Sequence, residues 1–250
     1  MKFLEETISV IMPAYNEGAH IFNNIKETAE TLKGFNCTYE IIVVDDGSQD
    51  NTLEEINRAA GLFKNITIVR NRENYGKGRA LKKGFRNSKC EYIVFLDSDM
   101  DLHPVQLQTF FDIMRLDKAD VVIGSKRHPN SRLEYPWHRR AISVVYFFLI
   151  KLVFGLPIRD TQTGLKLYKR EVLEKVFPKI LVNKFAYDLE LLVLAHHYGY
   201  KIAEAPVVMR YKRSAWGRIG FKAMYDTWWD TMAVWYRMYV MRYYDKPVKG

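Results

Sequence analysis

Short runs of apolar, often β-branched residues alternate with stretches of helical length along the first half of the chain. The runs are continuous rather than alternating, which is typical of strands buried on both faces of a parallel sheet. Helical stretches lie between them, as at 17–33 and 51–63. This pattern predicts a doubly wound α/β sheet. Its strands are expected in the runs 8–12, 41–44, 66–69, 92–96 and 121–123.

The second half of the chain has a different character. Arginine and aromatic residues are frequent over 126–140, and an apolar run follows over 141–157. That run contains Lys151 and is shorter than the roughly 20 apolar residues that cross a bilayer. We predict one main domain over 1–212 and a helical, aromatic-rich C-terminal region over 213–250.

The net charge of +9 attracts anions but does not say which ones. Nucleic acid, nucleotide phosphates and anionic lipid head groups all carry the required charge. Cys37 and Cys90 lack a paired spacing and fit a reducing compartment. The amino terminus lacks the apolar core of a secretory signal, so we expect a cytoplasmic protein.

Polar residues follow three of the predicted strands. Ligands of a doubly wound sheet bind beyond the carboxyl ends of its strands, so these positions are the candidate site. The clusters lie at 13–17, 45–48 and 97–101. We expect them to converge on one edge of the sheet.

The third cluster contains Asp97, Asp99 and Asp101. Carboxylates so close together repel one another unless a cation or a proton intervenes. Mg²⁺ or Mn²⁺ suits them, because a hard divalent ion takes oxygen ligands and completes its shell with substrate phosphates. For Asp101 and His103 the alternative is capping of the helix that Pro104 begins.

The segment 74–79 offers a contact for an anion. Its glycines, including Gly76, allow close approach of the backbone, and a helix amino end favours negative charge. Lys77 and Arg79 add positive charge. The alternative is an ordinary turn at the start of a helix. Opposite the carboxylates, the segment is predicted to contact a diphosphate.

These motifs, in this order, resemble the signatures of family 2 glycosyltransferases with the GT-A fold. The resemblance rests on the segments 13–17, 43–48, 76–78 and 97–99, and it extends over most of 7–212. The later segment 159–167 is similar to the dolichyl-phosphate mannose synthase and dolichyl-phosphate glucosyltransferase branch. Relatives of this kind transfer a sugar with inversion of the anomeric centre.

The resemblance implies roles for individual residues. Asp97 and Asp99 match the motif whose metal grips the diphosphate. Asp101 falls where the mannose synthases usually carry a glutamine, and this substitution makes it a third candidate ligand. The residues implied in nucleotide-sugar binding are Pro13, Tyr15, Glu17, Asp45, Asp46, Gly76, Lys77, Asp97, Asp160 and Gln162.

A phosphate acceptor needs a cationic clamp rather than a general base, because it is already anionic at neutral pH. Arginine suits this task, since its planar fork donates two hydrogen bonds at once. The resemblance implies Arg139 and Ser143, and a basic residue after 124–125 for which Arg127 is the candidate. A solvated charged loop is the alternative, and we prefer it for Arg132.

Asp188 falls near the catalytic aspartate of relatives that use alcohol acceptors. It is interpreted as a base, a positioning group or a carboxylate favoured by a helix amino end. Asp99, Arg139 and Asp188 are the predicted catalytic residues. His196 and His197 end the same helix and are interpreted as cap or surface residues.

The segment 217–244 predicts a helix that is apolar around most of its girth. Its tryptophans and tyrosines suit the boundary of a membrane, and its basic residues suit anionic lipids. Packing onto the chain's own domain, or onto a second copy in a homodimer, is the alternative. Peripheral attachment to the cytoplasmic face of a membrane is our hypothesis.

The sequence therefore predicts transfer of a hexose from a UDP-glucose or GDP-mannose type donor to polyprenyl or dolichyl phosphate. A soluble sugar or polysaccharide is the alternative acceptor, and a non-catalytic nucleotide-sugar sensor is the alternative outside enzymes. Nucleic-acid binding is not expected, because the basic residues form no stripe beside stacking aromatics.

Overall fold

The computed structural model describes residues 6–35, 37–133, 147, 150–182, 186–209 and 221–247, and over 221–226 only the backbone is described. These residues form a seven-stranded sheet with the strand order β3-β2-β1-β4-β7-β5-β8. A second sheet pairs two short strands, β6 and β9. The strands are β1 Thr7–Ala14, β2 Thr38–Asp45, β3 Ile66–Arg70, β4 Tyr92–Leu96, β5 Val121–Ser125, β6 Arg132–Leu133, β7 Leu165–Lys169, β8 Ile202–Pro206 and β9 Val208–Met209.

Strand β7 is the exception in a mainly parallel sheet. It runs antiparallel to both β4 and β5, whereas the other pairs in the sheet are parallel. Leu165, its first residue, pairs with Leu96, the last residue of β4. The residues that lead into β7 therefore lie at the carboxyl end of β4, where ligands of this class of sheet bind.

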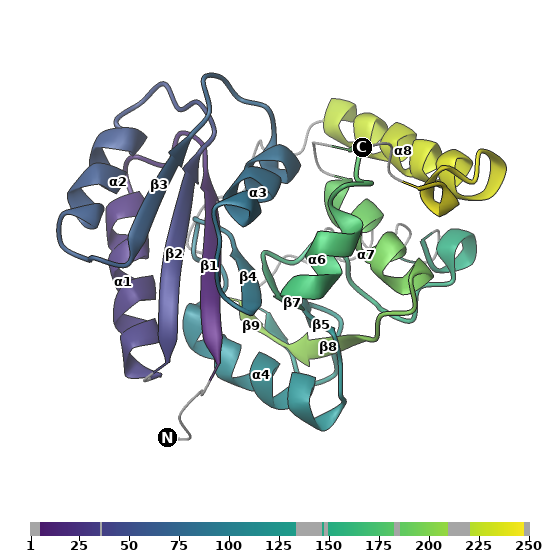
Figure 1. The fold of residues 1–250 in the computed structure, drawn as a ribbon, viewed down its shortest axis with the longest axis horizontal. Coiled ribbons are helices and arrows are strands. Elements are labelled where there is room, and N and C mark those ends of the chain that lie inside the picture. The colour runs from purple at the N-terminus through teal and green to yellow at the C-terminus, as the bar shows by residue number, and fades with distance from the viewer. Residues whose placement is uncertain are drawn as a thin grey trace.

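Helices cover both faces of the sheet (Figure 1). Apolar residues of α1, α2 and α4 share one hydrophobic cluster with the sheet, and those of α3, α6 and α7 share the other. The helices are α1 Ile21–Gly34, α2 Thr52–Ala60, α3 Lys77–Arg86, a 3-10 turn η1 Pro104–Gln106, α4 Leu107–Leu116, α6 Arg170–Val176 and α7 Tyr187–His197.

Successive side chains of a strand point to opposite faces of the sheet, so one apolar run contributes to the hydrophobic clusters on both faces. In β1, Ile8, Val10 and Met12 belong to the cluster of α1, while Ile11 belongs to the cluster of α3. All four side chains are fully buried. A continuous apolar run is thus required by burial on both faces.

The predicted doubly wound, mainly parallel sheet is confirmed, and each of the five predicted runs lies in a strand. The sequence interpretation did not identify β7 or β8. In β7, Lys166 stands between Leu165 and Leu167. Because of this lysine, the segment was interpreted as part of a polar motif and not as a buried strand.

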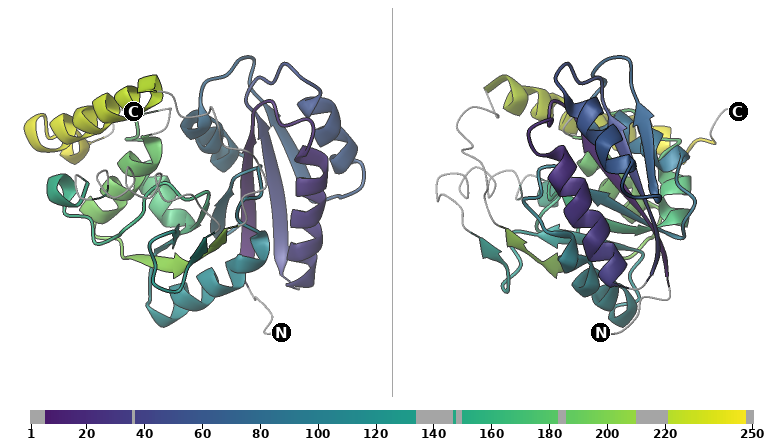
Figure 2. Two further views of the ribbon diagram at one scale, coloured as in Figure 1. Left: turned by 180° about the vertical axis from the view of Figure 1, so that it is seen from behind. Right: turned by 90° about the vertical axis from the view of Figure 1, so that its left-hand side faces the viewer.

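The C-terminal segment consists of α8 Phe221–Trp235, a π-helix η2 Tyr236–Val240 and a 3-10 turn η3 Tyr243–Asp245. It lies on the opposite side of the molecule from α1 and α2 (Figure 2). Val234, Met238 and Tyr244 are buried in the same cluster as α6 and α7. Other residues of the segment point outward and are about half exposed, among them Trp228, Trp229, Trp235, Tyr236, Tyr239 and Val240.

One face of the segment therefore packs on the main domain, as one of the two sequence interpretations requires. Another face remains exposed, and its attachment to a membrane stays a prediction. The boundary predicted at 212 stays a prediction, since 210–220 lie outside the described residues. In the part of the chain that is described, no helix has the length and apolar character that crossing a bilayer requires.

Glu190 on α7 fastens the C-terminal segment to the domain. Its carboxylate is fully buried and accepts hydrogen bonds from the backbone N–H groups of Leu181 and Val182. It also accepts from the guanidinium of Arg237, at 3.1 Å, and from the hydroxyl of Tyr244. Burial and the neighbouring carboxylate raise the pKa of Tyr244, so its phenol keeps the proton that it donates.

We expect Glu190→Gln to lower the free energy of unfolding by about 3 kcal/mol, because it leaves Arg237 without its buried counter-charge. Glu174→Gln is the matched control, because the Glu174 carboxylate is exposed and its ion pair with Arg170 is long, at 4.0 Å. Denaturant titration measures both. Equal, small effects in the two variants would show that Glu190 does not hold the segment.

Candidate active site

Asp97 stands directly after β4 and faces the residues that lead into β7. Its backbone N–H donates to the carbonyl of Gly164 at 3.0 Å. A Cβ atom on Gly164 would lie 2.5 Å from Oδ2 of Asp97, closer than side chains approach one another. Only glycine at 164 therefore leaves room for this carboxylate.

Lys77, the first residue of α3, forms an ion pair with Oδ1 of Asp97. Both side chains are one-third exposed, so the pair lies at the surface of the site. Burial alone would lower the pKa of Lys77, but Asp97 and Asp188 outweigh it and the net shift is upward. The predicted meeting of the 74–79 segment with the carboxylates is present in the structure.

Asp99 carries the most perturbed carboxylate of this cluster. Burial, followed by repulsion from Asp97 and Asp101, raises its pKa to about 6. The backbone N–H of Asp101 donates to Oδ1 of Asp99 and offsets part of this shift. Oxygen donors that repel one another in this way fit a hard divalent cation, which relieves the repulsion.

Within the described residues, no three His, Cys, Asp or Glu side chains are grouped to hold a metal ion by themselves. A complete protein cage is not needed for Mg²⁺, which is commonly held by one or two carboxylates together with substrate phosphates. Asp97 and Asp99 suit such an open arrangement. The capping alternative belongs to His103, whose Nδ1 accepts from the N–H of Val105 at 3.0 Å.

A second, deeper ion pair lies behind the first. Nζ of Lys166 donates to Oδ1 of Asp188 at 2.6 Å and to the carbonyl of Thr163 at 2.7 Å. Lys166 is 1% exposed and Asp188 is 5% exposed. Lys166 is within electrostatic reach of Lys77 and Asp97. The predicted residue Asp188 thus belongs to the site, at the first turn of α7.

Lys166 was not among the predicted site residues. The sequence offered one signal, because this lysine lies inside the 159–167 motif. A lone lysine in that motif gave no reason to expect burial, since lysine is almost never fully buried unless it is paired.

The loops after β1 and β2 are joined to each other. The N–H of Glu17 donates to Oγ1 of Thr52, and the N–H of Asn16 donates to Oγ of Ser48. Asn16 has a positive φ of 53°, a conformation that asparagine tolerates better than most residues. Tyr15 remains 41% exposed at this edge, while Glu17 is buried. Pro13 lies within β1.

Asp45 and Asp46 are both buried, and Oδ2 of Asp45 accepts no hydrogen bond from the described residues. Asp45 accepts from the N–H of Ser48 and lies 3.3 Å from Nε of Arg70. Asp46 accepts from Nδ2 of Asn71 and from the N–H groups of Tyr75 and Gly76. In this arrangement they shape the loops around the site, with Asp46 holding the loop before α3. Their predicted contact with a nucleoside stays a prediction.

Asp160 organises the loop that leads toward β7. Its carboxylate accepts from the N–H groups of Lys126 and Gln162. The guanidinium of Arg127 lies over the ring of Phe147, 4.8 Å from the centroid. Asp160 is close enough to Arg127 to oppose the lowering of that arginine's pKa by burial. Arg127 and Asp160 are therefore neighbours, as a shared site requires.

The predicted acceptor residues Arg139 and Ser143 lie outside the described residues. Their roles stay predictions. Arg132 lies in β6 and is exposed, as its interpretation as a solvated residue requires.

Comparison with known families places this geometry in context. The family model described as Glycosyl transferase family 2 matches residues 9–177. The chain belongs to glycosyltransferase family 2. The matched range contains most of β1, all of β4, the three aspartates after β4, and Lys166.

Two curated relatives are similar over most of the chain. Glycosyltransferase AglD of Haloferax volcanii is 32% identical over 202 residues, which are 80% of this chain and 32% of that protein. Dolichyl-phosphate beta-glucosyltransferase ALG5A of Trichomonas vaginalis is 34% identical over 209 residues, covering 80% of this chain and 64% of that protein. The chain thus spans a third to just under two thirds of these relatives.

A solved structure shares the fold. Glucosyl-3-phosphoglycerate synthase from Mycobacterium tuberculosis, solved with Mn²⁺, UDP and glucosyl-3-phosphoglycerate, superposes with a TM-score of 0.69. Its identity is 20%, and the match covers 92% of this chain and 79% of that one. The predicted GT-A fold of this family member is confirmed.

The Lys166–Asp188 pair predicts a strong coupling. We expect Lys166→Met to lower the free energy of unfolding by about 3 kcal/mol, because it leaves a buried carboxylate without a partner. Lys166→Met combined with Asp188→Leu should recover much of that loss. Denaturant unfolding of the double-mutant cycle measures the coupling.

The pair between Lys169 and Asp120, also at 2.7 Å but with side chains 34% and 22% exposed, is the control. Its coupling should be below about 1 kcal/mol. A double variant at 166 and 188 that is no more stable than Lys166→Met alone would contradict the buried pairing.

Proposed function

We propose that this family 2 enzyme transfers a hexose, with inversion, from a nucleotide-diphosphate sugar to a polyprenyl or dolichyl phosphate. The curated relatives named as dolichyl-phosphate beta-glucosyltransferases support the acceptor and favour glucose over mannose as the sugar. The single observation that carries the proposal is the ordered charge pattern at the end of β4, where Asp99, Asp97 and Lys77 adjoin the Lys166–Asp188 pair.

Asp97 and Asp99, with Asp101 beside them, are the residues that would hold Mg²⁺ or Mn²⁺. Structures of the fold relatives with Mn²⁺ or Mg²⁺ and UDP support use of such an ion. When bound, the ion offsets the negative charge that develops on the leaving diphosphate. Lys77, at the start of α3, would contribute positive charge to the same phosphates.

Tyr15, Glu17 and the loop shaped by Asp46 are proposed to hold the nucleoside. Tyr15 is exposed at the edge of the site, so its ring is free to stack on a base. Gly76, in the loop before α3, has a positive φ of 96°, a backbone conformation that favours glycine. Asp160 and Gln162 would order the loop around the sugar.

Asp188 is proposed as a positioning residue. Its Oδ1 accepts a hydrogen bond from Nζ of Lys166 at 2.6 Å, which fixes the carboxylate in place behind the site. A phosphate acceptor is already ionised and does not need a base. Arg127, Arg139 and Ser143 are the proposed acceptor clamp, in which an arginine suits phosphate through its two parallel donors.

The proposed reaction is tested by incubating the purified chain with several labelled nucleotide-sugars, Mg²⁺ or Mn²⁺, and a polyprenyl phosphate. We expect label in the extracted lipid from one donor, and a loss of at least about a hundredfold in Asp99→Asn. Asp112→Asn, on the exposed face of α4, is the control. Label in free sugar or polysaccharide instead of lipid would refute the proposed acceptor.

Asp188→Asn separates the two acceptor classes. With a phosphate acceptor, turnover should fall by about tenfold, since positioning is lost but no proton must be removed. With an alcohol acceptor that needs a base, turnover should be abolished. Initial rates over a range of acceptor concentrations distinguish a change in kcat from one in KM.

We also propose that the exposed face of the C-terminal segment attaches the enzyme to a membrane from the cytoplasmic side. Trp228, Trp229 and Trp235 are 46%, 56% and 39% exposed. Tryptophan and tyrosine prefer the head-group region of a bilayer. The net charge of +9 adds attraction to anionic lipids.

Co-sedimentation with vesicles of anionic phospholipid tests this attachment. Trp228→Ser with Trp229→Ser should reduce the bound fraction severalfold, because about half of each side chain is exposed and this apolar area would be buried at the membrane. Leu62→Ser, on the far side of the molecule and 64% exposed, is the control. Dimers in sedimentation analysis without vesicle binding would favour a second copy as the partner.

A further inference from the structure

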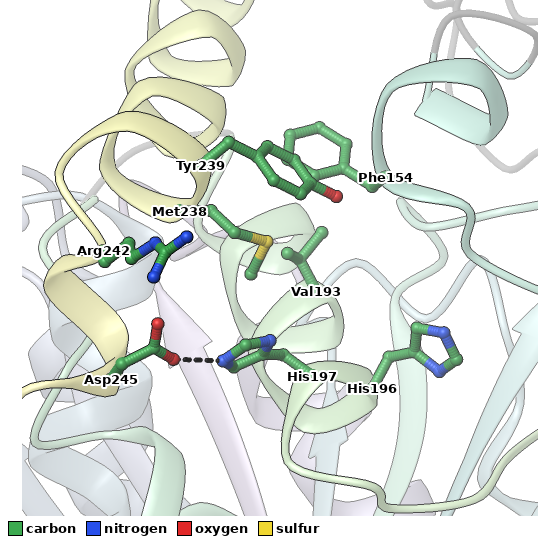
Figure 3. Close-up of a pocket in the computed structure, with 8 residues that line it drawn as sticks. All are labelled: Phe154, Val193, His196, His197, Met238, Tyr239, Arg242 and Asp245. Atoms are coloured by element: carbon green, nitrogen blue, oxygen red, sulfur yellow. Dashed lines mark hydrogen bonds and ion pairs between the residues drawn. The ribbon is translucent and has the colours of Figure 1, made fainter.

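A cavity of about 400 Å³ lies between the end of α7 and the C-terminal segment (Figure 3). None of the described residues that line it belongs to the site at the end of β4. The lining residues are Phe154, Val193, His196, His197, Met238, Tyr239, Arg242 and Asp245. Ligand pockets fall in the range of roughly 300–1,000 Å³ and combine an apolar lining with a few polar groups.

One wall of the cavity is apolar. The rings of Phe154 and Tyr239 lie 6.5 Å apart, and the side chains of Val193 and Met238 lie below them (Figure 3). Val193 and Met238 are buried, whereas Tyr239 is half exposed. The ring of Tyr239 also lies 6.1 Å from that of the exposed Trp235, so the wall adjoins the exposed aromatic residues of the C-terminal segment. Its apolar character suits a hydrocarbon chain.

The other wall is polar and contains a cation. The guanidinium of Arg242 points into the cavity (Figure 3) and, among the described residues, makes no hydrogen bond or ion pair. Asp245, by contrast, is already engaged, because its Oδ1 lies 2.7 Å from Nε2 of His197. Both His196 and His197, interpreted from the sequence as surface or cap residues, line this wall.

The backbone that presents these side chains is unusual. Tyr236–Val240 is a π-helix, in which the N–H of Met241 donates to the carbonyl of Tyr236 at 3.0 Å. Such turns are rare and occur frequently at functional sites. Arg242 follows with a positive φ of 47°, which costs a residue other than glycine conformational energy. Two uncommon conformations thus place Tyr239 and Arg242 at the same cavity.

We propose that this cavity binds the head group and upper chain of a phospholipid with a monoanionic phosphodiester. Arg242 would hold the phosphate, and Phe154, Met238 and Tyr239 would contact the chain. The inference rests on the proposed membrane attachment for the source of the ligand. It goes beyond that attachment by assigning a specific lipid site to residues outside the aromatic surface.

The charge on the polar wall selects among phosphates. Asp245 places a negative charge beside Arg242, so a dianionic phosphate monoester is repelled more strongly than a monoanionic phosphodiester. The polyprenyl phosphate acceptor is a monoester. The cavity therefore suits a lipid of the bilayer rather than the acceptor of the proposed reaction.

Calorimetric titration with a short-chain phosphatidylglycerol, kept below its micelle concentration, tests the site without a bilayer. We expect saturable binding that weakens at least tenfold in Arg242→Gln and several-fold in Tyr239→Ala. Both positions are exposed, so the variants should keep the wild-type melting temperature. Lys64→Gln, an exposed residue between α2 and β3, removes the same charge and should bind like the wild type.

Three results would overturn the proposal. Equal weakening in Lys64→Gln would indicate attraction to net charge alone, and unchanged binding in Arg242→Gln would exclude the phosphate contact. Displacement by a short-chain polyprenyl phosphate more readily than by phosphatidylglycerol would make the cavity an acceptor site. Because none of these measurements uses sugar transfer, the outcome is independent of whether the proposed reaction occurs.

Discussion

Repulsion among the carboxylates after β4 is the constraint around which the site is organised. Burial, together with repulsion from Asp97 and Asp101, raises the pKa of Asp99 to about 6. Lys77 offsets part of this charge through its ion pair with Asp97. A divalent ion bound together with a diphosphate would relieve the repulsion further. Behind the Lys77–Asp97 ion pair, the buried Lys166–Asp188 ion pair lies deeper in the core.

The antiparallel strand β7 makes this arrangement available. A parallel strand beside β4 would begin at the opposite edge of the sheet, and its leading residues would never meet Asp97. Reversal brings Gly164 against Asp97 and puts Lys166 one position into the strand, within reach of Asp188 on α7. Glu190, two residues after Asp188, then ties the same helix to the C-terminal segment. Strand β7 and helix α7 thus link the site after β4 to the C-terminal segment, whose exposed face is the proposed membrane contact.

Much of the sheet could be predicted from the sequence, because burial on both faces leaves continuous apolar runs such as Val43 to Val44 and Ile93 to Leu96. Strand β7 was not predicted because it contains a buried lysine, Lys166. This lysine is buried together with its ion-pair partner Asp188, which lies 22 residues later in the chain. Asp45 and Asp46 illustrate the opposite limit. Their motif predicted a ligand contact. In the structure both oxygens of Asp46 and Oδ1 of Asp45 accept hydrogen bonds from the protein, whereas Oδ2 of Asp45 accepts none from the described residues, so the ligand contact stays a prediction. The sequence identifies which residues gather at the carboxyl ends of the strands. The hydrogen-bond partner of each carboxylate oxygen is known only from the structure.

We propose that the carboxylates after β4 bind a divalent ion together with the diphosphate of the donor. A crystal structure with Mn²⁺ and UDP, using anomalous scattering to locate the ion, tests it most directly. We expect a Mn²⁺ peak in contact with Asp97 or Asp99 and with the diphosphate, and Lys77 moved from Asp97 toward the phosphates. UDP bound at this edge without an ion, or an ion bound away from these aspartates, would contradict it.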